Sequence, residues 1–253
     1  RVAVVRFDRG DNINALSQQA MRELRDVPRD FEDDLETSVV ILTGSAKAFC
    51  AGFDLKDPEG RQRDGLSVGE RIHRQRLGPK MCKAWQDMDQ VTIAAIEGHC
   101  VGGGAALVVS LDFRTCGKGA HFRIPEVELG MNMSWGSIPR MLALMGPART
   151  KQAVILASDR ITSAEALQWG LVENVVEDGQ ALGAAMAFAE KVARQPPIPV
   201  RMTKSSVNRL AHALDDLAAH MDADQNILTG LTEDYKEGTT AFREKRKPVF
   251  RGR

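Results

Sequence analysis

A single carboxylate in an apolar stretch is the first feature of this sequence that indicates chemistry. Glu126 follows Pro125, and its apolar neighbours along the chain are Val127, Leu129, Met131, Met133 and Trp135. A carboxylate that loses hydration in such surroundings has a raised pKa, which a general base working near neutral pH requires. Glu126 is therefore a candidate general base, and the alternative is a solvated surface charge.

Two glycine-containing turns have the composition needed to aim backbone N–H groups at a ligand. Gly102, Gly103 and Gly104 lie between a predicted apolar strand and a predicted helix, and Gly52 follows another apolar segment. Glycine has no Cβ, so such a turn can approach a ligand closely, and a helix N-terminus favours negative charge. The triplet lacks the G-x-G-x-x-G spacing and the lysine of nucleotide-binding motifs. It predicts either a site for a developing oxyanion or close packing of a helix in the core.

Alternating strands and helices are predicted to position these groups. Their predicted positions are residues 2–7, 38–43, 92–96 and 112–116 for strands, and 17–33, disturbed at Pro28, and 105–111 for helices. The stretch from residue 56 to residue 78 is polar and rich in glycine and charge, and we expect it to be mobile. Helical patterns dominate after residue 137, with one helix predicted over residues 214–231. We predict an α/β core at residues 1–195 and a C-terminal helical region at residues 196–253, divided at a proline-rich segment.

Composition excludes several classes of function. The 253 residues carry 34 basic and 34 acidic side chains, so no long-range field favours nucleic acid or an anionic membrane. The four cysteines are too widely spaced for a metal knuckle or a redox pair, and we expect no metal and no redox cofactor. No stretch reaches the roughly 20 apolar residues of a membrane span, and nothing resembles a signal peptide. We expect a soluble cytoplasmic protein, or a mitochondrial or peroxisomal one if a targeting segment precedes Arg1.

Four motifs follow one another along the chain at compatible spacings. They are residues 49–55 (FCAGFDL), the glycines of residues 98–104, Pro125-Glu126 with Leu129-Gly130, and residues 241–250 (AFREKRKPVF). In this order they resemble the successive signatures of the crotonase, or enoyl-CoA hydratase/isomerase, family. Any one motif is weak, but the four together span nearly the whole chain. The resemblance implies a spiral of repeated ββα units, with C-terminal helices that build homotrimers, often paired into hexamers.

The resemblance also implies roles for residues of this sequence. The substrate would be an acyl-CoA thioester, so coenzyme A enters as part of the substrate and no separate cofactor is needed. The N–H groups of Ala51 and Gly103 would form the oxyanion hole for the thioester carbonyl, Glu126 would move the proton, and residues 57–89 would cover the acyl end. Further candidates for contact with the substrate or coenzyme A are Asn12, Ile13, Phe53, Asp54, Leu55, Lys56, Gly102, Pro125, Met131 and Trp135.

One position departs from the family's pattern. Hydratases of this family typically carry a second glutamate two residues after the glycine triplet, where this sequence has Ala106. Hydration needs an activated water and a proton supplied at C2, a task naturally shared by two carboxylates, whereas a double-bond shift needs one base. We therefore expect a 3-enoyl-CoA to 2-enoyl-CoA isomerase. The alternatives are a hydratase that uses Glu126 with an ordered water or another acid such as Glu128, a decarboxylase or hydrolase on the same scaffold, and a non-catalytic acyl-CoA-binding protein.

Overall fold

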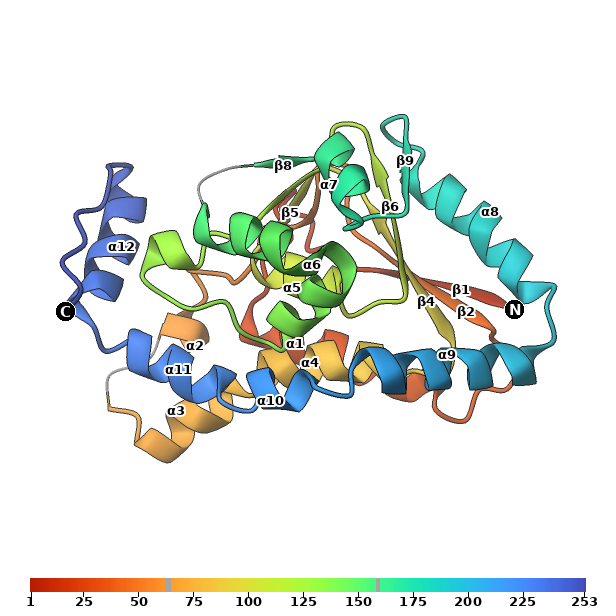
Figure 1. Cartoon of the computed structure of the whole chain (residues 1–253), viewed down its shortest axis with the longest axis horizontal. Coiled ribbons are helices and arrows are strands. Elements are labelled where there is room, and N and C mark those ends of the chain that lie inside the picture. The colour runs from red at the N-terminus through yellow and green to blue at the C-terminus, as the bar shows by residue number, and fades with distance from the viewer. Residues whose placement is uncertain (62–64, 158–159) are drawn as a thin grey trace.

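Two sheets form the centre of the computed structural model, which describes residues 1–61, 65–157 and 160–253 (Figure 1). The larger sheet is parallel and has the order β1-β2-β4-β6-β9. Its strands are β1 (Val2–Arg6), β2 (Val39–Thr43), β4 (Val91–Ile96), β6 (Phe113–Gly117) and β9 (Asn174–Val176). The smaller sheet, β3-β5-β7-β8, consists of β3 (Ala48–Cys50), β5 (His99–Val101), β7 (His121–Arg123) and β8 (Ile161–Thr162).

The chain passes from the larger sheet to the smaller one in each of three successive turns. β2 is followed by β3, β4 by β5 and β6 by β7, and α5 (Gly103–Val108) follows β5. The change of sheet after β4 occurs at Gly98, whose φ of +60° and close approach to the Lys47 backbone leave no room for a Cβ atom. This alternation is the ββα spiral that the resemblance implies.

Helices bury both faces of the larger sheet, which explains the continuous apolar runs of β2 and β4. On one face, α8 (Ala181–Ala193) packs small side chains such as Ala185 against Ile41 and Ile93. On the other face, the main core includes residues of α1 (Gln18–Asp26) and α4 (Leu77–Gln86). The ring of Trp85 is fully buried there, and its N–H donates to the Leu24 carbonyl at 2.8 Å.

The stretch from residue 56 to residue 78, predicted to be mobile, contains regular helices in its described part. They are α2 (Pro58–Arg61), α3 (Val68–Gln75) and the start of α4, while residues 62–64 lie outside the described residues. A capping box begins α3: the Ser67 hydroxyl accepts from the Glu70 N–H, and the Glu70 carboxylate accepts from the Ser67 N–H. These helices were not predicted, because the charged residues and glycines of this stretch were given more weight than the capping pattern of Ser67 and Glu70.

Pro28 ends α1 as expected, since the chain continues as the 3₁₀ helix η1 (Val27–Phe31). A second 3₁₀ helix, η2 (Val127–Leu129), follows β7. The later helices are α6 (Ser137–Ile155), α7 (Ser163–Trp169), α9 (Pro197–Ala211), α10 (Asp215–Ala219), α11 (Asp222–Thr229) and α12 (Glu233–Glu244). The single helix predicted over residues 214–231 is wrong, because the structure divides it into α10 and α11.

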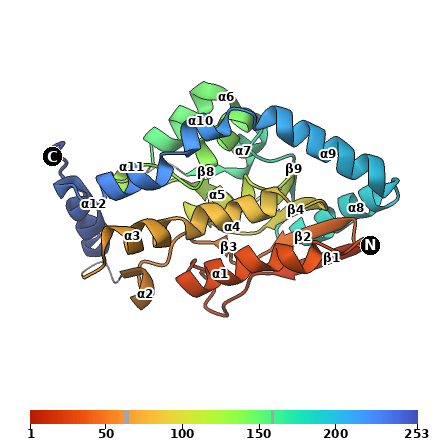
Figure 2. The same ribbon diagram turned by 90° about the horizontal axis from the view of Figure 1, so that it is seen from below.

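The C-terminal helices α9, α10 and α11 run one after another along one side of the molecule (Figures 1 and 2). Figure 2 shows that α11 ends beside α3. A largely buried ion pair fixes the start of this series, because the Lys204 ammonium lies 2.7 Å from the Asp112 carboxylate at the beginning of β6. None of the helices in the described residues is long and apolar enough to cross a membrane.

Candidate active site

Glu126 lies at the start of η2, directly after β7 and beside the glycine triplet. Its Oε2 atom is buried and has no hydrogen-bond partner in the described part of the chain. Desolvation by burial raises the pKa of Glu126 to about 7, although its own backbone N–H and the charge of Arg123 oppose the shift. A Cβ atom on Gly102 would lie 2.7 Å from Glu126 Oε1, so the carboxylate packs directly on that glycine. The structure therefore places a buried carboxylate with a raised pKa against the glycine triplet.

The two glycine-containing turns converge. A Cβ atom on Gly52 would lie 2.9 Å from the Val101 carbonyl oxygen and 3.6 Å from the Gly103 nitrogen. Gly52 has a φ of +88° and Gly102 one of +50°, and both values belong to a region that side chains disfavour. The glycines thus allow the backbone after β3 to approach the backbone before α5.

Pairing between residues 13–16 and residues 51–54 decides which amides of the first turn are available. The Ala51 N–H donates to the Ile13 carbonyl at 3.0 Å, the Leu16 N–H to the Gly52 carbonyl at 2.7 Å, and the Asp54 N–H to the Leu16 carbonyl at 3.0 Å. Leu16 and Phe53 form a parallel bridge, in which Leu16 bonds to the residues before and after Phe53. The N–H of Phe53 itself therefore points away from residues 13–16. Among the described residues it has no backbone acceptor.

This pairing corrects the prediction that Ala51 supplies an oxyanion-hole amide. The Ala51 N–H is already used within the protein, whereas the Phe53 N–H, two residues later, is not. The other predicted donor, Gly103, is the first residue of α5, where an N–H has no partner inside the helix. Gly102 supplies no side-chain cap, so nothing from that residue covers the Gly103 N–H.

The Trp135 ring lies against the second turn. A Cβ atom on Gly103 would lie 2.5 Å from the ring, and one on Gly78 of α4 would overlap the indole as well. Trp135 itself has a φ of +64°, a strained value for an aromatic residue. The turn is secured by Asp222 of α11, whose carboxylate accepts from the Gly136 N–H at 2.8 Å. Asp222 was not among the residues predicted from the sequence, because its contact with Gly136 joins residues 86 positions apart.

Comparison with known proteins identifies the family. Residues 1–253 match the model of a family described as enoyl-CoA hydratase/isomerase. The chain belongs to the enoyl-CoA hydratase/isomerase family. As a member of this family, it is an enzyme of the crotonase superfamily, a hydratase or an isomerase.

Named relatives and a solved structure support the same assignment along the full length. A short-chain-enoyl-CoA hydratase of Clostridium acetobutylicum is 34% identical over 98% of this chain and 93% of that protein. A crotonyl-CoA hydratase of Syntrophomonas wolfei is 34% identical over 99% of this chain and 94% of that protein. The crystal structure of a carnitinyl-CoA hydratase from Mycobacterium avium superimposes with a TM-score of 0.85 at 29% identity, covering 100% of this chain and 95% of that one. The crotonase fold predicted from the motifs is confirmed.

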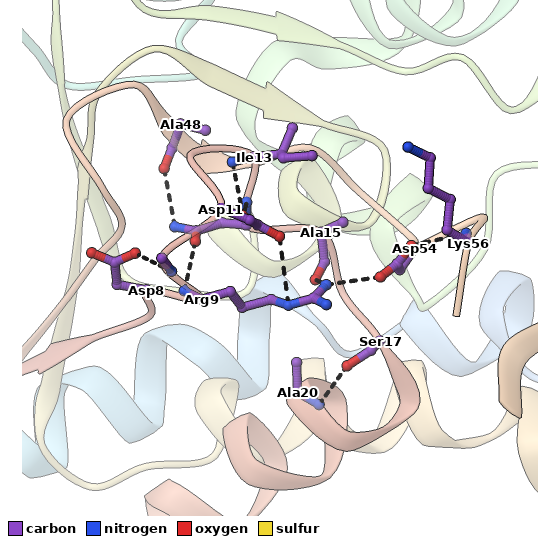
Figure 3. A network of polar contacts seen from close by, with 12 residues as sticks. Asp8, Arg9, Asp11, Ile13, Ala15, Ser17, Ala20, Ala48, Asp54 and Lys56 are labelled. Carbon is purple, nitrogen blue, oxygen red and sulfur yellow. Dashed lines mark hydrogen bonds and ion pairs between the residues drawn. The ribbon is translucent and has the colours of Figure 1, made fainter. Parts of the chain in front are cut away.

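In this family member, an exposed loop before the first turn carries two of the predicted coenzyme contacts (Figure 3). Asn12 and Ile13 are exposed, and Asn12 has a φ of +58°. The buried Asn14 anchors the loop, since its side-chain amide donates to the carbonyls of Phe7 and Ala48 at 2.7 and 3.2 Å. Asn14 was not predicted as a site residue, although an asparagine in a loop often bonds to the backbone of its neighbours and can anchor the loop.

Asp54 and Lys56 differ in their environment. Asp54 accepts from the Arg9 guanidinium at 2.8 Å and from the Lys56 N–H at 2.8 Å, so its carboxylate orders the loop (Figure 3). Lys56 is exposed, and its ammonium extends away from this network (Figure 3). Of these two residues, only Lys56 therefore presents a charged group to solvent at the mouth of the turn.

Two other predicted residues, Pro125 and Met131, form backbone hydrogen bonds in the turn that holds Glu126. The Met131 N–H donates to the Glu126 carbonyl at 2.8 Å, and the Pro125 carbonyl accepts from the Leu129 N–H at 3.1 Å. These contacts close the turn that holds the carboxylate. The Met131 side chain is half-buried and is not among the described residues that line the cavity beside Phe53 and Trp135.

Glu128, the acid considered as a partner for Glu126, and Asp112, just before β6, both have other partners in the structure. Glu128 forms an ion pair with Arg123. Asp112 accepts from the Thr92 N–H at 2.7 Å and pairs with Lys204. Ala106 is fully buried and lies one helical turn after Gly102, on the same face of α5. A methyl group thus occupies the position where the family's hydratases typically carry their second carboxylate.

Proposed function

We propose that this protein shifts the double bond of a 3-enoyl-CoA to form 2-enoyl-CoA, with Glu126 as the proton shuttle. The observation that carries the proposal is that Glu126, a buried carboxylate whose pKa is raised to about 7, packs on Gly102, while the fully buried Ala106 stands one helical turn after that glycine. One base near neutral pKa is sufficient to remove and return a proton, whereas activating a water requires further groups.

The reaction needs two proton transfers and no net change in composition. Ionised Glu126 removes a proton from C2 of the 3-enoyl thioester, and the C–H electron pair enters the conjugated system to form a dienolate. The protonated Glu126 then returns the proton at C4, and the double bond moves to C2–C3. The buried carboxylate reaches both carbons only if the acyl chain folds across it, so this geometry also selects the substrate conformation.

The dienolate oxygen requires hydrogen-bond donors, and the N–H groups of Phe53 and Gly103 are the ones proposed here. Both come from turns that approach each other through Gly52 and Gly102, and neither has a partner that the described backbone supplies. One such donor contributes about 3 kcal/mol to transition-state stabilisation, so two account for a large part of the rate. Ala51 has no place in this hole, because its N–H is bonded to Ile13.

Coenzyme A would enter as the carrier of the acyl group. We assign its contacts to the exposed loop at Asn12 and Ile13 and to the ammonium of Lys56, which suits a phosphate as a point charge. Asp54 and Leu55 complete the same segment. Assembly into a homotrimer or hexamer belongs to this proposal as well, and it is supported by large apolar side chains such as Leu210 and Leu217, which are 82% and 73% exposed on the C-terminal helices.

Hydration of 2-enoyl-CoA is the second candidate, and the names of the relatives favour it. The two named relatives described above are hydratases. In this protein a hydratase would use Glu126 together with a water held by backbone groups, since Glu128 is paired with Arg123. The two candidates share the base and the oxyanion hole but differ in whether water enters the product.

Replacing the base tests the proposal. We expect wild-type protein to convert 3-hexenoyl-CoA to 2-hexenoyl-CoA, and Glu126→Gln to lower this rate by at least about 1,000-fold while acyl-CoA affinity changes less than about threefold. Glu128→Gln is the matched control, because its carboxylate pairs with Arg123 and should be dispensable for turnover. Rapid hydration of crotonyl-CoA without any shift of 3-hexenoyl-CoA would replace the isomerase proposal with the hydratase.

A further inference from the structure

A cavity lies beside Phe53 and Trp135, next to the proposed oxyanion hole. The Phe53 side chain lines this cavity, and the N–H of the same residue is one of the two proposed donors. The Trp135 ring lines it as well and packs on Gly103, whose N–H is the other proposed donor. The cavity therefore adjoins the groups that we propose to hold the thioester carbonyl.

Gln18, in the first turn of α1, has a buried amide without a partner. The residue is only 6% exposed and lines the cavity, yet its side-chain amide makes no hydrogen bond to any of the described residues. The start of the helix does not need this amide, because the Ser17 hydroxyl caps it by accepting from the Ala20 N–H at 3.1 Å. The backbone N–H of Gln18 donates to Asp57 at 2.7 Å, which fixes the position of the residue. A buried amide without a partner is costly, so a ligand that bonds to it would explain why it is there.

Two further carboxamide side chains line the same cavity from other helices. Gln75 is the last residue of α3, and Asn226 lies in α11, which runs beside α3 (Figure 2). Both residues are half-buried, and neither side-chain amide bonds to another residue in the described part of the chain. A carboxamide carries two N–H donors and a carbonyl acceptor. The cavity wall thus offers unused donors and acceptors from three helices.

The charged side chains of the cavity wall are already compensated by other groups of the protein. Arg71 and Arg74 line the cavity, but both have other interactions within the protein. Arg74 donates to the Glu59 carbonyl at 2.8 Å, and the carboxylates of Glu59 and Glu70 are close enough to interact with its charge. No acidic side chain is among the lining residues that the structure describes. The unused hydrogen-bonding capacity of the wall therefore lies in its neutral amides.

From this arrangement we infer that the acyl group of the substrate carries a neutral oxygen, in a carbonyl or a hydroxyl group, beyond the reacting carbons, and that Gln18 recognises it. The inference rests on the proposed function only for the assignment of this cavity to the acyl group. A methyl group in place of the oxygen would leave the buried Gln18 amide without a partner. A carboxylate would lose hydration without gaining a cation that is not already compensated.

Binding of saturated thioesters tests the inference separately from catalysis, because they have no double bond to shift or hydrate. 5-Oxohexanoyl-CoA, 5-methylhexanoyl-CoA and glutaryl-CoA have nearly the same shape and carry a methyl ketone, an isopropyl group and a carboxylate at the same carbon. 6-Oxoheptanoyl-CoA, 6-methylheptanoyl-CoA and adipyl-CoA repeat the comparison with one more methylene, and 6-hydroxyhexanoyl-CoA against heptanoyl-CoA tests a hydroxyl group. We expect calorimetric titration of the full chain to show, in at least one set, about tenfold or tighter binding of the thioester with the neutral oxygen than of its apolar partner.

Variants of α1 test whether Gln18 is responsible. Gln18→Met keeps the length of the side chain and removes the amide, so the preference for the neutral oxygen should fall to less than about threefold while the apolar thioesters bind as tightly as before. Gln18→Asn withdraws the amide by one methylene and should reduce the preference as well, which keeps the inference testable if Gln18→Met does not fold. Gln19→Met is the matched control, since Gln19 is exposed and its amide donates to Glu23 at 2.7 Å. The preference should be unchanged in this control.

Three results would overturn the inference. The first is a wild-type protein that binds no neutral oxygen-bearing thioester more tightly than its apolar partner. The second is tighter binding of glutaryl-CoA or adipyl-CoA than of the matched ketone. The third is a Gln18→Met variant that weakens all thioesters equally, because the amide would then serve the fold alone. Absence of turnover on every enoyl-CoA would refute the proposed function while leaving a measured preference for the neutral oxygen intact.

Discussion

At the scale of single residues, Glu126 is defined by what surrounds its carboxylate. Burial without a partner for Oε2 makes the ionised form costly, and the adjacent Gly102 allows the carboxylate to approach the turn that carries the Gly103 amide. Carboxylates that form ion pairs elsewhere in the chain have lowered pKa values instead. The hydrogen bond from Arg22, for example, lowers the pKa of Glu59, although partial desolvation opposes the shift. The base is therefore distinguished by its environment.

The raised pKa of Glu126 predicts the pH dependence of catalysis. Because the ionised carboxylate is the base, kcat/KM should rise about tenfold per pH unit below pH 7 and level off above it, following the pKa of about 7. Initial rates on 3-hexenoyl-CoA between pH 5 and pH 9 measure this rise in kcat/KM. Glu128→Gln should keep the same shape of profile with a midpoint no higher than that of the wild type, because Arg123 loses its ion-pair partner and its charge lowers the pKa of Glu126. A midpoint near 4.5, the ordinary value, would mean that the carboxylate is solvated in the free enzyme.

The same group predicts a pH-dependent difference in stability. The folded-state pKa of about 7 exceeds the ordinary 4.5, so the stability contributed by protonated Glu126 is present below pH 4.5 and is lost as pH rises through 7. At about 1.4 kcal/mol per unit, the loss is about 3 kcal/mol. Glu126→Gln should therefore gain about 3 kcal/mol in unfolding free energy relative to wild type between pH 4.5 and pH 8, as measured by urea denaturation. A difference that stays constant with pH would contradict this.

At the scale of secondary-structure elements, the Trp135 ring joins α4 to α5. It packs on Gly78 of the first helix and Gly103 of the second, and α11 holds its turn through Asp222. Such contact between ring and backbone is possible only where both helices carry glycine. Next to the cavity beside Phe53 and Trp135, α4 and α5 are therefore held together by one aromatic residue, and α11 secures the turn that carries it.

Substituting helical glycines tests this arrangement. Gly78→Ala should destabilise the protein by about 1–3 kcal/mol and lower kcat, because the added methyl group would displace the indole. Gly69→Ala in α3 is the control: its nearest neighbour would be the Ser67 hydroxyl at 3.9 Å, so alanine should be neutral or stabilise by up to about 1 kcal/mol. Thermal unfolding and turnover measure both. Equal effects of the two substitutions would contradict this prediction, because the Trp135 ring would then move without cost to make room for the methyl group.

At the scale of the whole molecule, the C-terminal helices connect the sheet to the site. α9 is fixed to the sheet edge by the Lys204–Asp112 pair, and α11 closes the cavity through Asn226 and secures the Trp135 turn through Asp222. Their outer surface is apolar at several positions, with Leu210, Leu217 and Leu228 all exposed. A surface of this kind is typical of a protein–protein interface.

Assembly should depend on that surface. We expect light scattering of the wild-type protein to give three or six times the chain mass, and Leu217→Glu to shift it toward the monomer, because a charge at the interface core is costly. Leu167→Glu is the matched control, since Leu167 is 45% exposed on α7, which lies on the opposite side of the molecule from α9, α10 and α11 in Figure 1. A monomeric wild-type protein would refute the proposed trimer or hexamer.

The sequence by itself determined the fold family, and it predicted the proposed base and one of the two proposed oxyanion donors. These features are local: residues 49–55, the glycine triplet and Pro125-Glu126 are short motifs in which residue type reflects a backbone or chemical requirement. The helix at Ser67 was missed, although a Ser-x-x-Glu cap marks it, because composition was given more weight than capping.

Only the tertiary structure decided which amide of the first turn has no backbone acceptor among the described residues, and what lines the cavity beside Phe53 and Trp135. The N–H of Ala51 is bonded to Ile13, 38 residues earlier, and this pairing directs the N–H of Phe53 to the other side. Likewise, Gln18, Arg71 and Asn226 meet at one cavity from three separate helices. Hydrogen-bond direction and cavity lining depend on contacts between distant segments, and a local pattern contains no information about which segments those are.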